Sequence, residues 1–321
     1  MSFTEKLKRI RTFLGETEKG KMIQKRGRQV MVAMIAGLII YQLFDIGWSD
    51  VLGSLPTQPL FYILFVVIFI TLPVAEVFIY RQVWPLKRRH MFRAFLTKKV
   101  YNDEVMGYSG EVYLFIWGKK RLNRPEMEVL KNVRDNNIIS ALTSTSVAFT
   151  LVGALVFTGV LNLEDIIGRV DVVYFFTAFV IVAVFVALLI QFRQYVFSLP
   201  LKSALKVGSI YMSRFLIHNA LLIVQWAVVI PDTPLSIWFI FLAIIIVVNR
   251  LPFIPSRDLV FLWAGIELSR VLEMATASVA AMLLVSSALK KLTNLILFLV
   301  LSRMDANEDA LRKAQENEEG V

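Results

Sequence analysis

One glutamate, Glu111, interrupts an otherwise apolar stretch of the sequence, in the run Gly107-Tyr108-Ser109-Gly110-Glu111-Val112-Tyr113. The stretch is too short to cross a bilayer, and lysines and arginines flank it on both sides. A charge or a glycine-broken backbone is costly in lipid, whereas a cavity walled by protein accommodates both. We therefore predict a re-entrant segment at residues 100–118, in which Tyr108, Gly110 and Glu111 line a binding site. The alternative is that Glu111 caps a short helix at the membrane surface.

The second half of the chain has a comparable break at residues 249–258, where two prolines stand at a point at which a helix would otherwise continue. Guanidinium groups bind phosphate through two parallel hydrogen bonds, so three arginines near this break are candidates for binding a lipid phosphate: Arg250, Arg257 and Arg270. The alternative is that they anchor helix ends at the inner membrane surface. Glu267, Arg270 and Glu273 are spaced three apart on one helical face, which forms either a cavity wall or a surface-lying face.

Other polar residues in apolar stretches carry weaker signals. Arg214 and His218 lie one helical turn apart, so the cation would lower the proton affinity of the histidine, and the two form a candidate proton relay. The alternative is a histidine that only packs. Glu76 is interpreted as a helix-end residue near the inner surface. The acidic run at residues 102–104 is interpreted as a solvated turn.

The composition defines the fold class. Of 321 residues, 57% are hydrophobic and many lie in long apolar runs, which predicts an all-α, polytopic helical membrane protein with six to eight transmembrane helices and two re-entrant or broken short helices. The absence of cysteine excludes disulfides and thiolate metal sites, and two histidines leave little for a transition metal. With no nucleotide loop, catalytic triad or zinc motif, we expect no cofactor, no bound metal and no catalytic residue. The net charge of +10 fits basic inner loops better than nucleic-acid binding.

The distribution of lysine and arginine predicts the topology. Residues 81–99 are expected to form a cytoplasmic loop, and the basic segment 119–136 is expected on the same side of the membrane. Residues 1–28 hold nine of them and are expected to form a basic amphipathic segment on the cytoplasmic surface. Residues 29–301 form the membrane domain and 302–321 a charged, loosely ordered tail. The predicted spans are 29–48, 60–80, 138–161, 172–192, 209–230 and 235–249, followed by a short helix at 259–269. Residues 271–301 form either one span or two.

Part of this pattern resembles a known family. The run from Gly107 to Glu111 resembles the first signature of the flippase-like membrane domain of lysylphosphatidylglycerol synthases, a re-entrant turn that ends in Gly-Glu and is followed by an apolar run. Gly110-Glu111 match its end, and residues 112–117 match the apolar run. Arg134-Asp135 falls where the family often has an acidic residue opening its next span. The second signature, a Pro-Gly-Gly turn followed by glutamate, would lie at residues 251–261.

At that second turn the sequence departs from the family's pattern. Pro252 and Pro255 fit, but Ser256 and Arg257 replace the glycines and Leu262 replaces the glutamate. The resemblance implies movement or binding of a lipid within the bilayer. The leading hypothesis is a bacterial inner-membrane lipid transporter that binds a lipid head group between the two broken segments, and the charge distribution places its N-terminus in the cytoplasm.

The resemblance also suggests partners. Anionic or amphipathic membrane lipids are expected to bind, and a membrane protein partner or a second copy of the chain is a further candidate. Two alternatives remain open for the function. One is a non-catalytic subunit or scaffold of a membrane complex. The other is an enzyme that modifies lipid head groups, which would need a nucleophile or a set of metal ligands.

Overall fold

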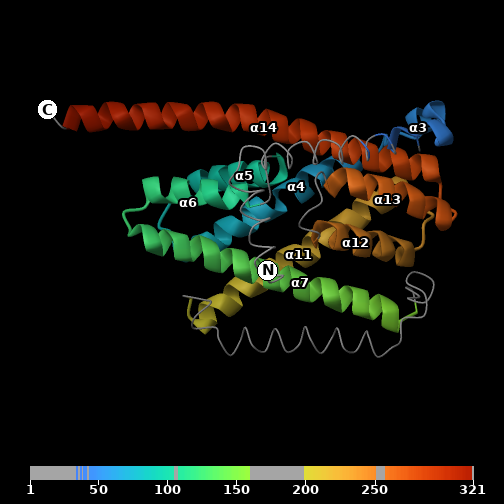
Figure 1. The fold of residues 1–321 in the computed structure, drawn as a ribbon, viewed down its shortest axis with the longest axis horizontal. Coiled ribbons are helices and arrows are strands. Elements are labelled where there is room, and N and C mark those ends of the chain that lie inside the picture. Colours follow the sequence, from blue (N-terminus) through green and yellow to red (C-terminus); the bar gives the residue numbers. More distant parts are fainter. Residues whose placement is uncertain are drawn as a thin grey trace, which may run out of the picture. The chain divides into compact units, whose positions relative to one another are not determined.

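The computed structural model describes residues 34, 37, 39–41, 43–104, 108–159, 199–250 and 257–319. All regular secondary structure in these ranges is helical (Figure 1), which confirms the predicted all-α class. The basic segment 1–28, the predicted span at 172–192 and the proline-rich residues 251–256 lie outside the described residues. By the density of internal packing the chain forms two compact units: unit 1 comprises residues 1–57 and 229–287, and unit 2 comprises residues 58–228 and 288–321.

Three helices in the described part of the chain are long and apolar enough to cross a membrane. They are α4 (Pro59–Tyr80), α11 (Leu201–Val229) and the first part, Thr276–Leu301, of α14 (Thr276–Glu319). The helix α12 (Leu235–Arg250) is apolar but shorter. The helix α4 starts with a proline at its first position, where no amide hydrogen is needed, and it continues through Pro73.

Unit 2 is built around a hairpin of two helices, neither of which is long and apolar enough to cross a membrane. These are α5 (Arg88–Glu104) and α6 (Ser109–Arg121), which pack against each other, and α5 also packs against α4 (Figure 1). Although α5 is rich in charge, it buries the positions Met91, Phe95 and Lys98 on one face. Residues 81–99, predicted from their charge as a cytoplasmic loop, therefore belong largely to a packed helix.

Aromatic rings form the core of unit 2 beneath this hairpin. The ring centroids of Tyr80 and Trp84 lie 4.6 Å apart, those of Tyr80 and Phe95 lie 5.0 Å apart, and those of Trp84 and Trp117 lie 6.2 Å apart. Such tilted ring pairs contribute roughly 0.5–1.5 kcal/mol each beyond their buried area. The aromatic core fixes the end of α4 against α5 and α6.

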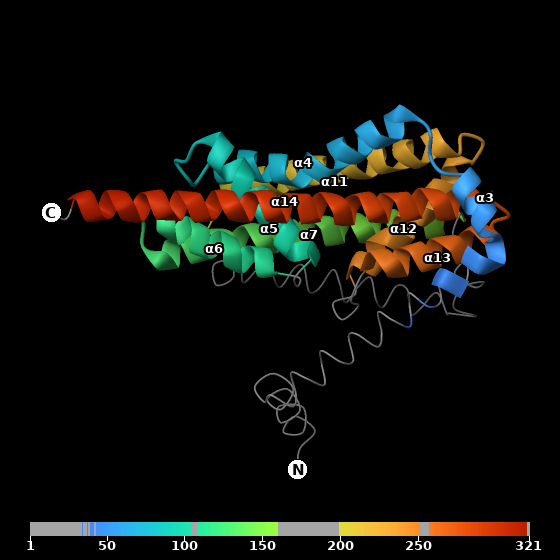
Figure 2. The same cartoon turned by 90° about the horizontal axis from the view of Figure 1, so that it is seen from above.

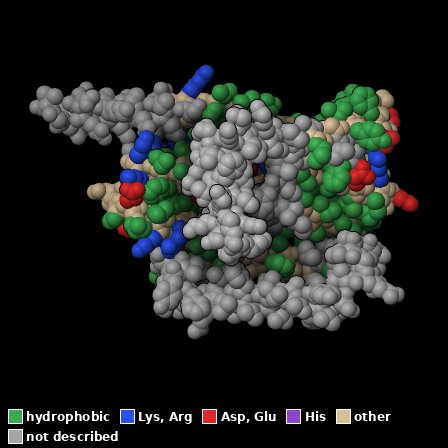
Figure 3. Space-filling model, viewed as in Figure 1, with side chains coloured by type: hydrophobic (Ala, Val, Ile, Leu, Met, Phe, Trp, Pro, Cys, Tyr) green, Lys and Arg blue, Asp and Glu red, His purple; other side chains and the backbone are tan. Residues whose placement is uncertain are grey.

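The helix α7 (Glu126–Phe157) begins well before the predicted span at residue 138. Lysine and arginine side chains gather where α6 ends and α7 begins (Figure 3), at Lys119, Lys120, Arg121 and Arg124. The basic segment 119–136 thus contains the end of α6, a short turn and the first part of α7. Asp135, expected to open a span, lies inside α7, fully buried, and accepts a hydrogen bond from the backbone N–H of Leu199.

Unit 1 contains α3 (Trp48–Gly53), α12, α13 (Arg257–Val271) and the start of α14. The helices α12 and α13 pack against each other around the buried side chains of Trp238, Phe241 and Ile266. Gly265 allows α13 to pack closely against α14, because a Cβ atom there would lie 2.5 Å from the Leu283 side chain. The predicted short helix at 259–269 is confirmed as α13.

The helix α14 corrects one expectation and decides between two others. It is a single uninterrupted helix from Thr276 to Glu319 (Figures 1 and 2), so residues 271–301 contain one apolar helix rather than two. The prediction of a loosely ordered tail at 302–321 was wrong for residues up to Glu319. The tail is charged, but it is rich in alanine, leucine, glutamate, lysine and arginine, which all favour helix.

Candidate functional site

A buried lysine lies between two glutamates in unit 2. Lys98 on α5 donates a hydrogen bond to Oε1 of Glu76 on α4, and its Nζ lies 3.4 Å from Oε1 of Glu111 on α6. The exposed fractions of these side chains are 9% for Lys98, 3% for Glu76 and 16% for Glu111. Three helices thus each contribute one charged group to a single site, which we call the Glu76–Lys98–Glu111 cluster.

The start of α6 is fixed onto the end of α5, and this fixes Glu111 beside Lys98. The backbone N–H of Gly110 donates to Oδ1 of Asn102 at 2.8 Å, and the Ser109 hydroxyl donates to the carbonyl of Tyr101 at 2.7 Å. Gly110 lies directly against α5, because a Cβ atom at this position would be only 2.1 Å from the carbonyl oxygen of Lys98. Gly110 is therefore a packing residue that lets the two helices approach closely.

The charges of the cluster determine the protonation state of Lys98. Burial alone would lower the pKa of Lys98, but the negative charges of Glu76 and Glu111 outweigh burial and hold the pKa above its ordinary value. Lys98 is therefore charged at neutral pH. The guanidinium of Arg214 on α11 is close enough to Glu76 for their charges to attract. With Arg214 included, the site contains two acids and two bases.

Glu111 is the less firmly held of the two carboxylates. Its contact with Lys98 is longer than a normal hydrogen bond, and its Oε2 atom is buried without a hydrogen-bond partner among the described residues. A buried carboxylate oxygen without a donor is costly, and binding a donor or a cationic group would relieve that cost. Glu111 is the member of the cluster best placed to change its partner.

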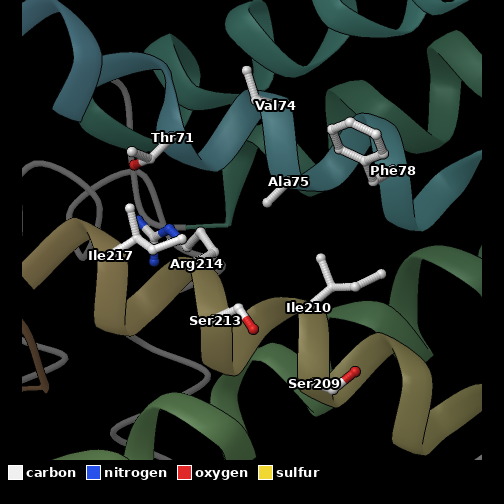
Figure 4. Close-up of a pocket in the computed structure, with 9 residues that line it drawn as sticks. All are labelled: Thr71, Val74, Ala75, Phe78, Ser209, Ile210, Ser213, Arg214 and Ile217. Atoms are coloured by element: carbon white, nitrogen blue, oxygen red, sulfur yellow. The ribbon is translucent and has the colours of Figure 1, made fainter.

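A groove of about 340 Å³ lies beside the cluster, between α4 and α11 (Figure 4). It is lined mainly by apolar side chains: Val74, Ala75, Phe78, Ile210 and Ile217, together with Thr71, Ser209, Ser213 and Arg214. Arg214 extends from α11 into the space between the helices, and its Nε atom is buried without a hydrogen-bond partner in the described part of the chain. The same guanidinium thus faces both the groove and Glu76.

His218 has a partner in the structure. Its Nδ1 atom lies 3.1 Å from the hydroxyl oxygen of Thr71, and that hydroxyl lies 2.8 Å from the carbonyl of Ile68, to which it donates. Since the hydroxyl has one hydrogen and gives it to the carbonyl, Nδ1 of His218 is the donor to Thr71. No hydrogen bond joins Arg214 to His218 in the described part of the chain, so the candidate relay stays a prediction.

The residues predicted to bind a head group are divided between the two units. Tyr108, Gly110 and Glu111 are in unit 2, and Tyr108 is a largely exposed residue with left-handed backbone (φ 70°) at the start of α6. Arg257, Glu267 and Arg270 are in unit 1 on α13. Arg270 binds Asp45 at 2.8 Å and lies 3.9 Å from Glu267. The side chain of Arg250 lies outside the described part of the structure.

Three sequence interpretations need correction. Glu76 was interpreted as a helix-end residue, but it is buried in α4 and binds Lys98. Glu273 was placed on one helical face with Glu267 and Arg270, but α13 ends at Val271 and Glu273 has a positive φ of 52° in the following turn. The acidic run 102–104 is not a solvated turn. It ends α5, and its two carboxylates bind the side chains of Lys99, Lys290, Lys291 and Asn294.

Lys98 is the functional candidate that the sequence did not indicate. It lies in a basic stretch with six other lysines and arginines, so nothing in its local sequence separates it from surface cations. Glu76 did carry a usable signal, because a carboxylate inside an apolar run of membrane-spanning length is a candidate site in itself. No group of three or more His, Asp or Glu side chains in the described ranges could hold a metal ion.

Comparisons with protein-family models, with curated proteins and with solved structures found no match to this chain. The site therefore has to be interpreted from its own geometry.

Asp103 supports a pH-dependent prediction. Burial alone would raise the pKa of Asp103, but the positive charges of Lys99 and Lys290, with hydrogen bonds from Lys99 and Asn294, lower it to about 2. Relative to its ordinary value of 3.8, this shift corresponds to about 2 kcal/mol of stability at neutral pH. Because the folded pKa is the lower one, this stabilisation is complete above about pH 4 and is lost as the pH falls towards 2.

We expect Asp103→Asn to lower the free energy of unfolding by about 2 kcal/mol at neutral pH. Unfolding of the purified protein in detergent, followed at neutral pH and at a pH near the folded pKa of about 2, measures the effect. The matched control is Asp232→Asn, since Asp232 is an exposed carboxylate in a turn. A loss no larger than that of the control, or one that persists unchanged below the pKa of the folded state, contradicts the assignment.

Proposed function

We propose that this protein is an integral membrane lipid transporter of the flippase-like type, with six to eight spans and a cytoplasmic N-terminus in a bacterial inner membrane. The observation that carries the proposal is the pairing of an apolar groove with a buried charge cluster, joined by Arg214. An amphiphile needs both environments at once, an apolar surface for its chain and charge for its head group. The resemblance of residues 107–117 to the flippase-like domain family points to the same class.

The proposal assigns different tasks to the groove and the cluster. The groove between α4 and α11 holds the apolar part of the lipid, and Arg214 attracts an anionic head group because its Nε has no partner among the described residues. Bringing an anion to this set of two acids and two bases adds negative charge to a low-dielectric interior, so the contacts within the cluster must rearrange. Glu111 is the member best placed to change its partner, because one of its oxygens lacks a donor.

The test is lipid translocation in proteoliposomes with a fluorescent phosphatidylglycerol. We expect Glu111→Gln, which keeps the shape of the side chain but removes its charge, to slow translocation. The control is Glu126→Gln, because Glu126 forms an exposed ion pair with Lys119. Wild-type rates in Glu111→Gln contradict the proposal, as does the absence of translocation by the wild-type protein.

A further inference from the structure

A second pocket continues the groove at one end. It has a volume of about 310 Å³ and is lined by Phe78, Arg81, Gln82, Lys206 and Ile210. Phe78 and Ile210 also line the first groove, so the two hollows share a wall on both α4 and α11. Along α11, Lys206 lies at the opposite end of the two hollows from Ile217, and Arg214 lies beside Ile217.

The two cations at this end come from parts of the chain far apart in sequence. Arg81 is the first residue after α4, and Lys206 lies near the start of α11. Both side chains are exposed, and no ion pair is found for either one among the residues that the structure describes. The preference for basic residues at the inner surface explains a cation at each helix end. It does not explain why both line one pocket together with a glutamine amide.

The spacing along α11 separates this end from Arg214. Lys206 and Arg214 are eight positions apart, which corresponds to about 12 Å along the helix axis. Between these two cations the groove is lined on α11 by Ile210 with Ser209 and Ser213, and across from them by Phe78 and Ala75, as Figure 4 shows. A ligand that fills the groove from Lys206 inwards therefore needs an anionic end and an apolar body.

We propose that the groove binds one anionic phospholipid, with its phosphate against Arg81 and Lys206 and an acyl chain along Phe78, Ile210 and Val74. A soluble phosphate would leave the apolar part empty. A zwitterionic lipid has no net charge to balance two cations, so an anionic lipid is preferred. The inference rests on the proposed function only in taking α4 and α11 as membrane spans. It adds the entry point of the lipid and the sign of its head group.

The test measures lipid binding apart from transport. Wild-type protein is placed in phosphatidylcholine nanodiscs that contain a small fraction of spin-labelled phosphatidylglycerol, and immobilised label is measured by electron paramagnetic resonance. We expect Arg81→Gln/Lys206→Gln to weaken phosphatidylglycerol binding about tenfold or more, because each cation near a membrane surface contributes about 1 kcal/mol to binding of an anionic lipid. Ile210→Trp, which fills the apolar part, is expected to displace the label without any loss of charge.

The matched control is Lys87→Gln/Lys202→Gln, which removes the same charge from exposed positions near the same helix ends but outside both pockets. Equal weakening in the control, equal binding of spin-labelled phosphatidylcholine, or displacement of the lipid by inorganic phosphate alone overturns the site. Unfolding temperatures verify that each variant is folded. Specific binding without translocation by the wild-type protein supports this site and contradicts the transport function. Translocation without specific binding overturns this site alone.

Discussion

Lys98→Met is expected to lower the free energy of unfolding by about 3–5 kcal/mol, since removing one partner of a buried ion pair leaves uncompensated charge in the interior. Here the ammonium of Lys98 pairs with the carboxylates of Glu76 and Glu111, so both lose this counterion at once. Glu76 is almost fully buried. Methionine preserves most of the side-chain volume, so the loss reports charge rather than a cavity. Tryptophan fluorescence during unfolding in detergent follows the transition directly, because Trp84 and Trp117 lie in the core of the same unit.

Two comparisons make the Lys98 result specific. Adding Glu76→Gln to Lys98→Met removes one of the orphaned charges, and we expect it to recover part of the lost stability. Lys119→Met removes a lysine from an exposed ion pair with Glu126, whose side chains are 53% and 56% exposed, and should cost at most about 1 kcal/mol. If Lys98→Met and Lys119→Met unfold alike, the buried cluster does not contribute as inferred.

Gly110→Ala is expected to destabilise the protein by about 3 kcal/mol or more, at the upper end of overpacking effects. The new methyl carbon would lie 2.1 Å from the carbonyl oxygen of Lys98 and 2.9 Å from the side chain of Asn102. The nearest obstacle is backbone, which cannot rotate away, so α6 must shift from α5. That shift would also weaken the contact between Lys98 and Glu111. We expect the variant to unfold earlier and to lose the translocation activity proposed for the protein.

Gly208→Ala is the matched control for Gly110→Ala. Gly208 is also a helical glycine in unit 2, but a Cβ atom there would meet Ile139 and Thr143 at 3.7 and 3.8 Å, which is ordinary packing distance. Alanine favours helix over glycine by about 1 kcal/mol, so Gly208→Ala should be neutral or stabilising. Similar unfolding of the two variants would mean that α5 and α6 can separate without loss.

The fold class was predictable because long apolar runs leave few alternatives. The span predicted at 60–80 appears as α4 and that at 235–249 as α12, with boundaries that agree to within a residue. The prediction failed where a helix is rich in charged residues. Residues 81–99 count as a basic loop, yet they supply most of α5, whose apolar positions recur at helical spacing. Charge counting and periodicity pointed to different structures there, and packing against α4 and α6 decided between them.

The site was predictable only in part. Glu111 was identified from its apolar surroundings, and the structure places it in the first turn of α6 with a buried lysine as its partner. The identity of that partner depends on how α5 folds back onto α6, which no local pattern encodes. The arginines that were expected to bind the same head group as Glu111 lie in the other unit, since Arg257 and Arg270 belong to unit 1. Sequence spacing locates charges along a helix and says little about which helices meet.

Pro73 connects the groove with the charge cluster mechanically. A proline has no amide hydrogen, so the carbonyl of Phe69, one turn earlier in α4, loses its usual helical donor, and the helix bends most easily at this point. Val74, Ala75 and Phe78, which line the groove, and Glu76, which binds Lys98, all follow within two turns. Bending α4 at Pro73 would move the wall of the groove and the Glu76 carboxylate together. Widening the groove and stretching the ion pair are then the same movement.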